Sequence, residues 1–303
     1  MQAINGGAAH ATSAARPSFS LCLVLVLGGC QASLPPPPAW QSSEGRNHAE
    51  LGHIVDLANG QLISPEQLVQ HLSAVPRVLV GEKHDNPDHH ALQLWLLRAL
   101  EGQRVQGSLL LEMLQPEQQP LLDELAGQPL PADLPKALAW QDGWDWQLYG
   151  PIVTEALQQR VPVLAANLSP GEMRQAYRQP SSLPGERSNA PMVKAALLEH
   201  VRAGHCGMLP ESQLPAMLAV QQQRDRRMAE RLLAAPQPAL LLAGAYHVRK
   251  DLGVPLHLAD LQAQGESKVL LLAEVGEQVE AGEADFVWYT AAMPEQDYCA
   301  QLR

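Results

Sequence analysis

The chain has 303 residues, of which 46% are hydrophobic, and its formal net charge is −11. Lys and Arg number 21 against 32 Asp and Glu, and they form no cluster, which excludes a nucleic-acid-binding protein because phosphates demand a basic surface. This length suits one large domain, or one domain with a small lobe.

The first thirty residues predict a lipoprotein signal peptide. A largely apolar stretch, residues 17–27, follows Arg16 and ends in a Gly-Gly-Cys sequence at Cys30. The stretch is too short for a membrane-spanning helix. Two small residues before a cysteine suit the lipoprotein peptidase, so we expect residues 1–29 to be removed and Cys30 to be lipidated. The alternative is an ordinary buried cysteine.

The residues after Cys30 predict where the protein resides and how it is attached. Gln31 stands where Asp often retains lipoproteins in the inner membrane, which favours an outer-membrane lipoprotein facing the periplasm of a Gram-negative cell. The Pro-rich segment 30–46, with four prolines at 35–38, predicts an extended tether between the lipid and the folded body. The protein would therefore contact the membrane through its lipid alone.

Of the four cysteines, two can form a disulfide. Cys22 would leave with the signal peptide and Cys30 would be acylated, so Cys206 and Cys299 are the two that can pair in an oxidising periplasm. The sequence does not show whether they form a disulfide.

Beyond the tether, short apolar runs alternate with amphipathic helical stretches. Residues 54–63 predict a hairpin around Asn59-Gly60, and Ser64 predicts the start of a helix. Strand-like runs follow at 78–80, 109–111, 161–165, 239–243 and 269–272. This alternation predicts an α/β fold over 47–303, with a mostly parallel sheet flanked by helices. A helical lobe is expected around 115–160 and 190–235.

Polar residues follow four of the predicted strands: Glu82 with His84, then Glu112, Asn167 and His247. In an open parallel sheet, ligands bind beyond the carboxyl ends of the strands. These residues therefore predict one polar site at one edge of the sheet. The alternative for Glu82 and His84 is a solvated loop.

The segment GEKHDNPDHH, residues 81–90, is the densest group of ionisable residues in the chain. Asp85 or Asn86 can cap a helix that begins at Pro87. His89 and His90 then fall in its first turn, where a solvated surface is as plausible as a site.

A second polar region combines the segment HCGMLP, which begins at His205, with a helical stripe. Gln221, Arg224, Asp225 and Met228 share one helical face by their spacing. The stripe is compatible with a site, and the alternative is a solvent-exposed face.

The strand-end residues are of types that also bind metals, but none has the spacing of a known zinc motif. The sequence also lacks the nucleophile elbow of α/β-hydrolases, a P-loop and a dinucleotide fingerprint.

Six separated segments, in the same order, resemble the ChaN family of iron-regulated haem-binding lipoproteins, which belongs to the Tiki superfamily. The resemblance covers roughly residues 50–275. The segments are GEKHDNPDHH at 81–90, LLEM ending at Met113, AANL at 165–168, HCGMLP at 205–210, QxxRDxxMA at 221–229 and GAYHVRKDLGVP at 244–255.

The resemblance implies a protein that binds haem as a homodimer, with two haem groups face to face and tyrosine and histidine near the irons. The wider group also contains metal-dependent proteases and erythromycin-esterase-like enzymes. A metal-dependent hydrolase using Glu82, His84, Glu112 and His247 is therefore the alternative to a haem-binding protein without turnover. A scaffold that binds a peptide or protein is the third possibility. Tyr246 departs from the family pattern, in which Gly or Asn is expected before the histidine.

Haem iron accepts Tyr phenolate, His imidazole, Met or Cys thiolate. Tyr177 ranks first as the axial ligand, because it shares a predicted helix with Arg174, which can pair with a haem propionate. Tyr246 ranks second, and His205 is the favoured histidine because a loop can present it. Tyr289 lies in a strand-like run and is expected to pack in the core. The tyrosines of the mature chain are Tyr149, Tyr177, Tyr246, Tyr289 and Tyr298.

Overall fold

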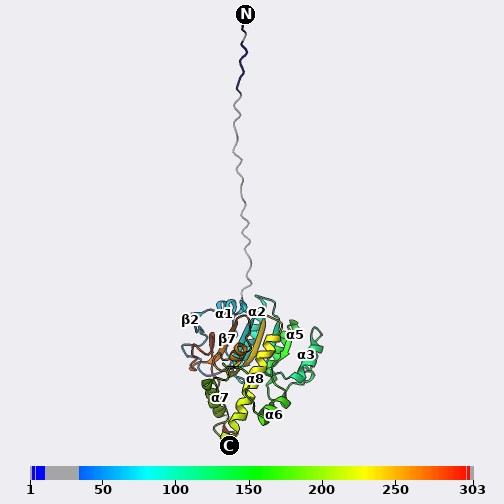
Figure 1. Cartoon of the computed structure of the whole chain (residues 1–303), viewed down its shortest axis with the longest axis vertical. Helices are drawn as coiled ribbons and strands as arrows, with labels where there is room; N and C mark the ends of the chain where they lie inside the picture. Colours follow the sequence, from blue (N-terminus) through cyan, green and yellow to red (C-terminus); the bar gives the residue numbers. More distant parts are fainter. Residues whose placement is uncertain (1, 4, 11–33, 298, 301–303) are drawn as a thin grey trace. The chain divides into compact units, whose positions relative to one another are not determined.

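The computed structural model describes residues 2–3, 5–10, 34–297, 299 and 300. Contacts divide the chain into two units, Met1–Ser33 and Leu34–Arg303. Most of the predicted signal peptide, and Cys30 itself, lie outside the described residues. The second unit contains every helix and strand described below (Figure 1).

A mixed, mostly parallel sheet of eight strands forms the centre of this unit, in the order β2-β1-β8-β7-β3-β6-β4-β5. The six strands from β8 to β5 are parallel to one another, whereas β1 pairs antiparallel with both β2 and β8. The strands are β1 (Ile54–Asp56), β2 (Gln61–Ile63), β3 (Arg77–Glu82), β4 (Ser108–Leu111), β5 (Val163–Ala165), β6 (Ala239–Gly244), β7 (Ser267–Glu274) and β8 (Phe286–Thr290). The predicted α/β fold is confirmed.

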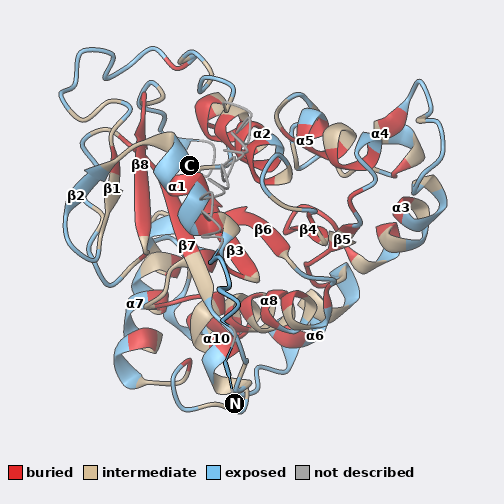
Figure 2. Cartoon of the chain, turned by 90° about the horizontal axis from the view of Figure 1, so that it is seen from above, coloured by how far each residue is buried: buried red, intermediate tan, exposed pale blue. Residues whose placement is uncertain are grey.

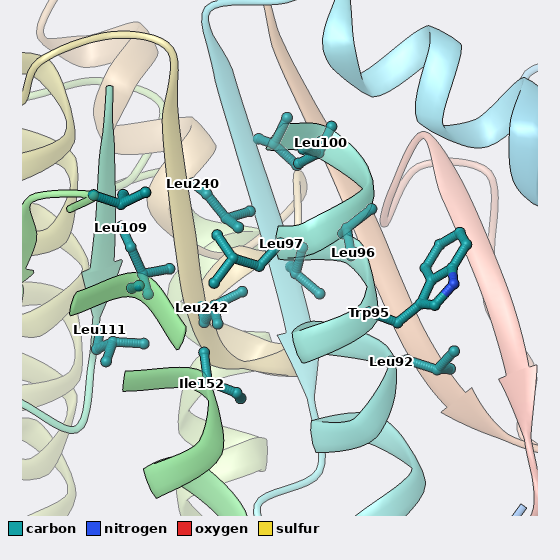
Figure 3. Packing of buried hydrophobic residues seen from close by; sticks show 14 of the residues in the cluster. Leu92, Trp95, Leu96, Leu97, Leu100, Leu109, Leu111, Ile152, Leu240 and Leu242 are labelled. Atoms are coloured by element: carbon teal, nitrogen blue, oxygen red, sulfur yellow. The ribbon is translucent and has the colours of Figure 1, made fainter. Parts of the chain in front are cut away.

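Helices cover both faces of the sheet, so the strands are apolar throughout rather than alternating with polar residues. Residues alternate between the faces: Val80 belongs to one core cluster and Leu79 to the other. The first cluster packs α1 (Pro65–Ser73), α2 (Pro87–Glu101) and α5 (Trp146–Gln158) on the sheet. Figure 3 shows leucines of α2 against Leu109, Leu240 and Leu242. In Figure 2 the strands are the buried layer between these helices and α8.

The second face is covered by α8 (Leu214–Ala234), α9 (Ala245–Val248) and α10 (Val254–Asp260), through residues such as Met228 and Val254. Region 190–235, which we expected to belong to a lobe, consists of α7 (Pro191–Gly204), η2 (Glu211–Gln213) and α8. The buried side of α8 packs on the sheet, so α8 is part of the α/β layer. Region 115–160 is helical as expected, with η1 (Pro116–Gln118), α3 (Gln119–Leu125), α4 (Leu134–Ala137) and α5. The remaining helix is α6 (Pro170–Arg178).

The register aligns the carboxyl ends of four neighbouring strands. Glu82 pairs with Gly244 between β3 and β6, and Leu111 pairs with Leu242 of β6 and with Ala165 of β5. Polar residues that end or follow these strands therefore meet at one edge of the sheet.

The segment expected to be an extended tether is part of the folded unit from Leu34 onward. Leu34 and Trp40 pack on the first core cluster, and Ser42 is buried. Glu44 forms a bridge with Ala292, beyond the end of β8. Residues 34–46 thus belong to the folded unit rather than to a free tether, because Leu34 and Trp40, on either side of the prolines, find apolar partners on the body.

A disulfide joins Cys206, at the end of α7, to Cys299 near the end of the chain. It closes a loop with a sequence separation of 93 residues. Within the described ranges, no helix is long and apolar enough to cross a membrane.

Candidate functional site

A cavity of about 860 Å³ opens at the carboxyl edge of the sheet. Its volume lies in the range of about 300–1,000 Å³ that is usual for small-molecule sites. The residues that line it come from the strand ends, α7, α8, α9 and the chain between β7 and β8. They are Glu82, Lys83, His84, Glu112, Trp144, His200, Gln221, Arg224, Gly244, Ala245, Tyr246, His247, Arg249, Leu271, Leu272, Ala273, Glu277, Gln278, Val279 and Glu283.

The polar residues at the strand ends, Glu82, His84, Glu112, Asn167 and His247, are called the cavity floor below. Glu82 and His84 form a pair on this floor. The side chain of Glu82 is fully buried at the end of β3, and its Oε1 lies 2.6 Å from Nδ1 of His84. The His84 ring is 45% exposed. Burial lowers the pKa of His84, but the hydrogen bond and negative charge of Glu82 outweigh burial, so the pKa is raised. The cavity floor thus presents a basic, carboxylate-backed imidazole.

Tyr149 of α5 fixes this pair from the helical lobe. Its hydroxyl donates to Oε1 of Glu82 at 2.9 Å, and its ring packs edge-on against His90, with 4.5 Å between the centroids. Burial, and then the charge of Glu82, raise the pKa of Tyr149. The phenol therefore stays protonated and remains a donor. Trp144 packs edge-on against His84 at 4.9 Å.

Glu112 is the centre of a second group on the floor. Its Oε2 accepts from the backbone N–H of Gly244 at 2.8 Å, and its Oε1 pairs with the Arg224 guanidinium. Nε2 of His247 lies 3.3 Å from the same Oε1, and Nδ1 of His247 contacts the buried carboxylate of Asp225. The Glu112 carboxylate is thus held by one backbone and two side-chain donors.

The charges of this group depend on one another. Burial lowers the pKa of His247, but Glu112 and Asp225 outweigh burial and raise it to about 9. Burial raises the pKa of Glu112, but His247 and Arg224 outweigh it, so the pKa lies well below its usual value. At neutral pH an imidazolium therefore lies between two buried carboxylates.

Asn167 completes the floor and connects its parts. Its Nδ2 donates to the carbonyl of Glu112 at 2.8 Å, and its Oδ1 accepts from Nε of Arg224 at 3.2 Å. A Cβ at Gly244 would lie 2.9 Å from Cε1 of His84 and 3.7 Å from Oε2 of Glu112, so Gly244 lies between the two groups. The structure thus brings Glu82, His84, Glu112, Asn167 and His247 together at one edge.

An aromatic pair lies at the opening of the cavity. Tyr246 of α9 is 40% exposed, and its ring stacks on His200 of α7 with 3.4 Å between the centroids. The guanidinium of Arg249 lies over the Tyr246 ring at 5.5 Å from its centroid. Burial, then the charges of His247 and Arg249, lower the pKa of His200 to about 4, so its imidazole is neutral at neutral pH.

Tyr177, Arg174 and His205 do not line this cavity. Tyr177 and Arg174 lie on α6 and are exposed. His205 directly follows α7, and its Nδ1 lies 2.8 Å from the carbonyl oxygen of Val201, the preceding turn of the helix. Tyr289 is buried in β8, as its strand-like surroundings indicated.

His89 and His90 are both buried and connect structural elements. Nε2 of His89 lies 2.9 Å from Oγ1 of Thr290, and Nε2 of His90 lies 3.0 Å from the carbonyl oxygen of His84. Asn86 caps α2 by accepting from the backbone N–H of Asp88. This segment is therefore built into the fold and is not a solvated loop.

Sequence reasoning missed His200, because nothing in its helical surroundings distinguishes it from a surface histidine. Arg249 stood in a segment that carried the family resemblance, but no role followed from its position. The polar stripe of α8, which the sequence left open between a site and a solvent-exposed face, faces the site. Gln221, Arg224 and Asp225 all contact the floor, and Nε2 of Gln221 lies 3.1 Å from Nδ1 of His247.

Among the described residues, no group of three or more His, Cys, Asp and Glu side chains is placed to hold a metal ion. The wall of the cavity combines polar groups with Leu271, Leu272, Ala273 and Val279. An apolar wall beside a phenol and an imidazole suits a flat, largely apolar ligand that carries a metal of its own.

A family model and a solved structure indicate the same family for this chain. Residues 68–258 match the family model described as haem-binding uptake, Tiki superfamily, ChaN. A solved structure of cofacial haem binding to ChaN of Campylobacter jejuni is 32% identical with a TM-score of 0.73, covering 78% of this chain and 95% of that one. No protein with a curated description matches the sequence.

Two more distant structures resemble the chain weakly. The RRSP effector domain of a Vibrio vulnificus toxin is 13% identical with a TM-score of 0.45, covering 78% of this chain and 39% of that one. The erythromycin esterase EreC is 14% identical with a TM-score of 0.44, covering 83% and 86%. The family match and the Campylobacter structure decide the matter: the chain belongs to the ChaN family of the Tiki superfamily.

Proposed function

We propose that this protein binds haem in the cavity at the carboxyl edge of its sheet and takes part in haem uptake, storage or transfer as an outer-membrane lipoprotein. Haem is cargo in this proposal, and no turnover is required. The observation that carries it is the stacked pair of Tyr246 and His200, which lies at the opening of a cavity with a partly apolar wall.

Tyr246 is the axial ligand that the geometry favours. Its ring is fixed on one side by His200, while the side chain stays 40% exposed at the cavity. Ferric haem iron accepts a phenolate oxygen. His200 is held neutral, so its imidazole is also a competent ligand or hydrogen-bond partner. Tyr177, with the higher rank from sequence, lies outside the cavity lining and becomes the second choice.

The residues of the cavity floor are not haem ligands in this proposal. Glu82, Glu112 and His247 are buried and hold one another through hydrogen bonds and charge. We assign them to shaping the polar end of the cavity. Arg224, Lys83 and Arg249 are cations that line the cavity. Each already pairs with a carboxylate, so a haem propionate would share its cation with that carboxylate.

The lipid anchor at Cys30 and the homodimer belong to the same proposal. Support for the anchor comes from the apolar stretch and the Gly-Gly-Cys sequence. Support for the dimer comes from family membership and from the Campylobacter protein, whose haem binding is cofacial. Two copies that each bind haem at an open cavity would bring the exposed haem faces together.

The test is a haemin titration of Tyr246→Phe, with Tyr177→Phe as the matched control. Phe keeps the ring and its stacking on His200 but removes the oxygen ligand. We expect Tyr246→Phe to weaken haemin binding at least about tenfold, or ~1.4 kcal/mol, and to remove the tyrosinate-type absorption spectrum. Tyr177→Phe should bind as the unchanged protein does.

Two outcomes would redirect the proposal. Loss of the spectrum in Tyr177→Phe with Tyr246→Phe unaffected would return the ligand to α6 and its neighbour Arg174. Chelator-sensitive hydrolysis of ester substrates, without haem binding, would favour a metal-dependent hydrolase built on Glu82, His84, Glu112 and His247.

A further inference from the structure

The residues that lead into the folded unit are fixed along α2. The indole N–H of Trp95 donates to the carbonyl of Pro35 at 2.9 Å. The backbone N–H groups of Gln41 and Ser42 donate to the two carboxylate oxygens of Asp88, at 2.6 and 3.0 Å. Asp88 lies in the first turn of α2 and Trp95 two turns later, so the segment runs along the helix in the opposite direction.

Along this path, the point at which the chain enters the folded unit, near Leu34, lies away from the cavity. Because α2 begins at the carboxyl edge of the sheet, moving from Asp88 to Trp95 leads about 10 Å away from that edge. Leu34 packs on the core cluster that α1, α2 and α5 share. The cavity, in contrast, takes His200 from α7, Arg224 from α8 and Tyr246 from α9, and α8 and α9 cover the other face of the sheet.

The chain between the lipid and the body is short. Four peptide units join Cys30 to Leu34, and they span at most about 14 Å even when fully extended. A lipid on Cys30 would therefore keep Leu34 within about that distance of the membrane surface. If residues 30–46 were a free tether, the body could take any orientation relative to the membrane. Because Pro35, Gln41 and Ser42 are fixed on α2, the orientation of the body is restricted.

We infer that, in the monomer without haem, the face of the body that carries α1 and α2 lies against the lipid surface and the cavity opens away from the bilayer. The inference rests on the proposed lipidation of Cys30. A cavity turned to the periplasm exchanges its cargo with soluble partners rather than with groups inside the membrane.

The test uses the full, processed chain in vesicles of phosphatidylethanolamine and phosphatidylglycerol that contain lipids with a fluorescence quencher at the headgroup. Two positions receive a thiol probe: Val105→Cys and Met192→Cys. Val105 is 90% exposed in the connection that follows α2, and Met192 is 79% exposed at the start of α7. The disulfide leaves no native thiol of the body to compete for the label.

We expect loss of fluorescence at position 105 and none at position 192. A Gly/Ser insertion of about 20 residues before Leu34 should remove the difference, since such a linker reaches about 25 Å on average. Equal quenching at both positions, or stronger quenching at 192, with the protein bound to vesicles, would overturn the orientation alone. Protein that stays in solution would overturn the lipid anchor, and the orientation with it.

Discussion

At the scale of single residues, the buried group of Glu112, His247 and Asp225 determines how stability depends on pH. The pKa of His247 is about 9 in the folded protein, against 6.5 for an ordinary histidine. A raised pKa means that the stabilisation is complete below pH 6.5 and is lost as pH rises toward 9. The difference corresponds to about 3 kcal/mol.

His247→Gln should therefore destabilise the protein much more at pH 6.5 than at pH 9. At the lower pH the variant leaves the buried Asp225 carboxylate without its cation and Glu112 with Arg224 alone, at a cost of about 3–5 kcal/mol. Urea unfolding at both pH values measures this difference. His205→Gln is the control, because His205 lies outside the cluster, and it should keep the dependence of the unchanged protein. The same loss at both pH values in His247→Gln would show that His247 is not charged in the fold.

The polar floor could be predicted from sequence because each of its members follows a strand, and parallel strands end at one edge. The choice among tyrosines could not. Tyr246 lies at the cavity because α9 turns directly after Gly244 and because α7 brings His200 onto its ring. The stacking joins residues 200 and 246, which lie far apart in the sequence, so no local pattern carries it.

At the scale of elements, the disulfide between Cys206 and Cys299 ties the C-terminal residues to the end of α7. His200 lies on the same helix. Closing a loop of this length restricts the unfolded chain, so the bond should stabilise the body by about 2–4 kcal/mol. The double variant Cys206→Ser/Cys299→Ser should show this loss in urea unfolding.

The same measurement has an internal control. A reductant should lower the stability of the unchanged body to that of the double variant and should leave the variant as it is. If the unfolded, unreduced body instead shows two free thiols in a thiol titration, the cysteines are not paired.

The strands could be predicted at this scale because each is short, apolar and rich in Val and Leu, as strands buried on both faces are. All five strand-like runs between residues 78 and 272 correspond to strands, as does the hairpin of β1 and β2. The role of α8 could not be predicted, because its polar stripe was compatible with solvent. Only the sheet edge, with Glu112 and His247, shows that the stripe faces a site.

At the scale of the whole molecule, the proposed attachment to a membrane depends on one residue, Cys30. Cys30→Ser removes the thiol that would carry the lipid. We expect the variant to incorporate no palmitate and to appear in the soluble periplasmic fraction or as unprocessed precursor, while its haemin binding stays unchanged. Palmitate labelling in cells measures the lipidation, fractionation measures where the variant is found, and a haemin titration measures the binding. Label retained on the serine variant would contradict lipidation at Cys30.

The most direct measurement is the visible absorption spectrum of the soluble body, residues 34–303, titrated with haemin. We predict a Soret band that saturates at one haem per chain, because the described part of each chain has a cavity of suitable size with the stacked phenol and imidazole of Tyr246 and His200 at its opening. Dimerisation on haem addition, followed by light scattering, would accompany it. A spectrum that stays equal to that of free haemin at every protein concentration would contradict the account.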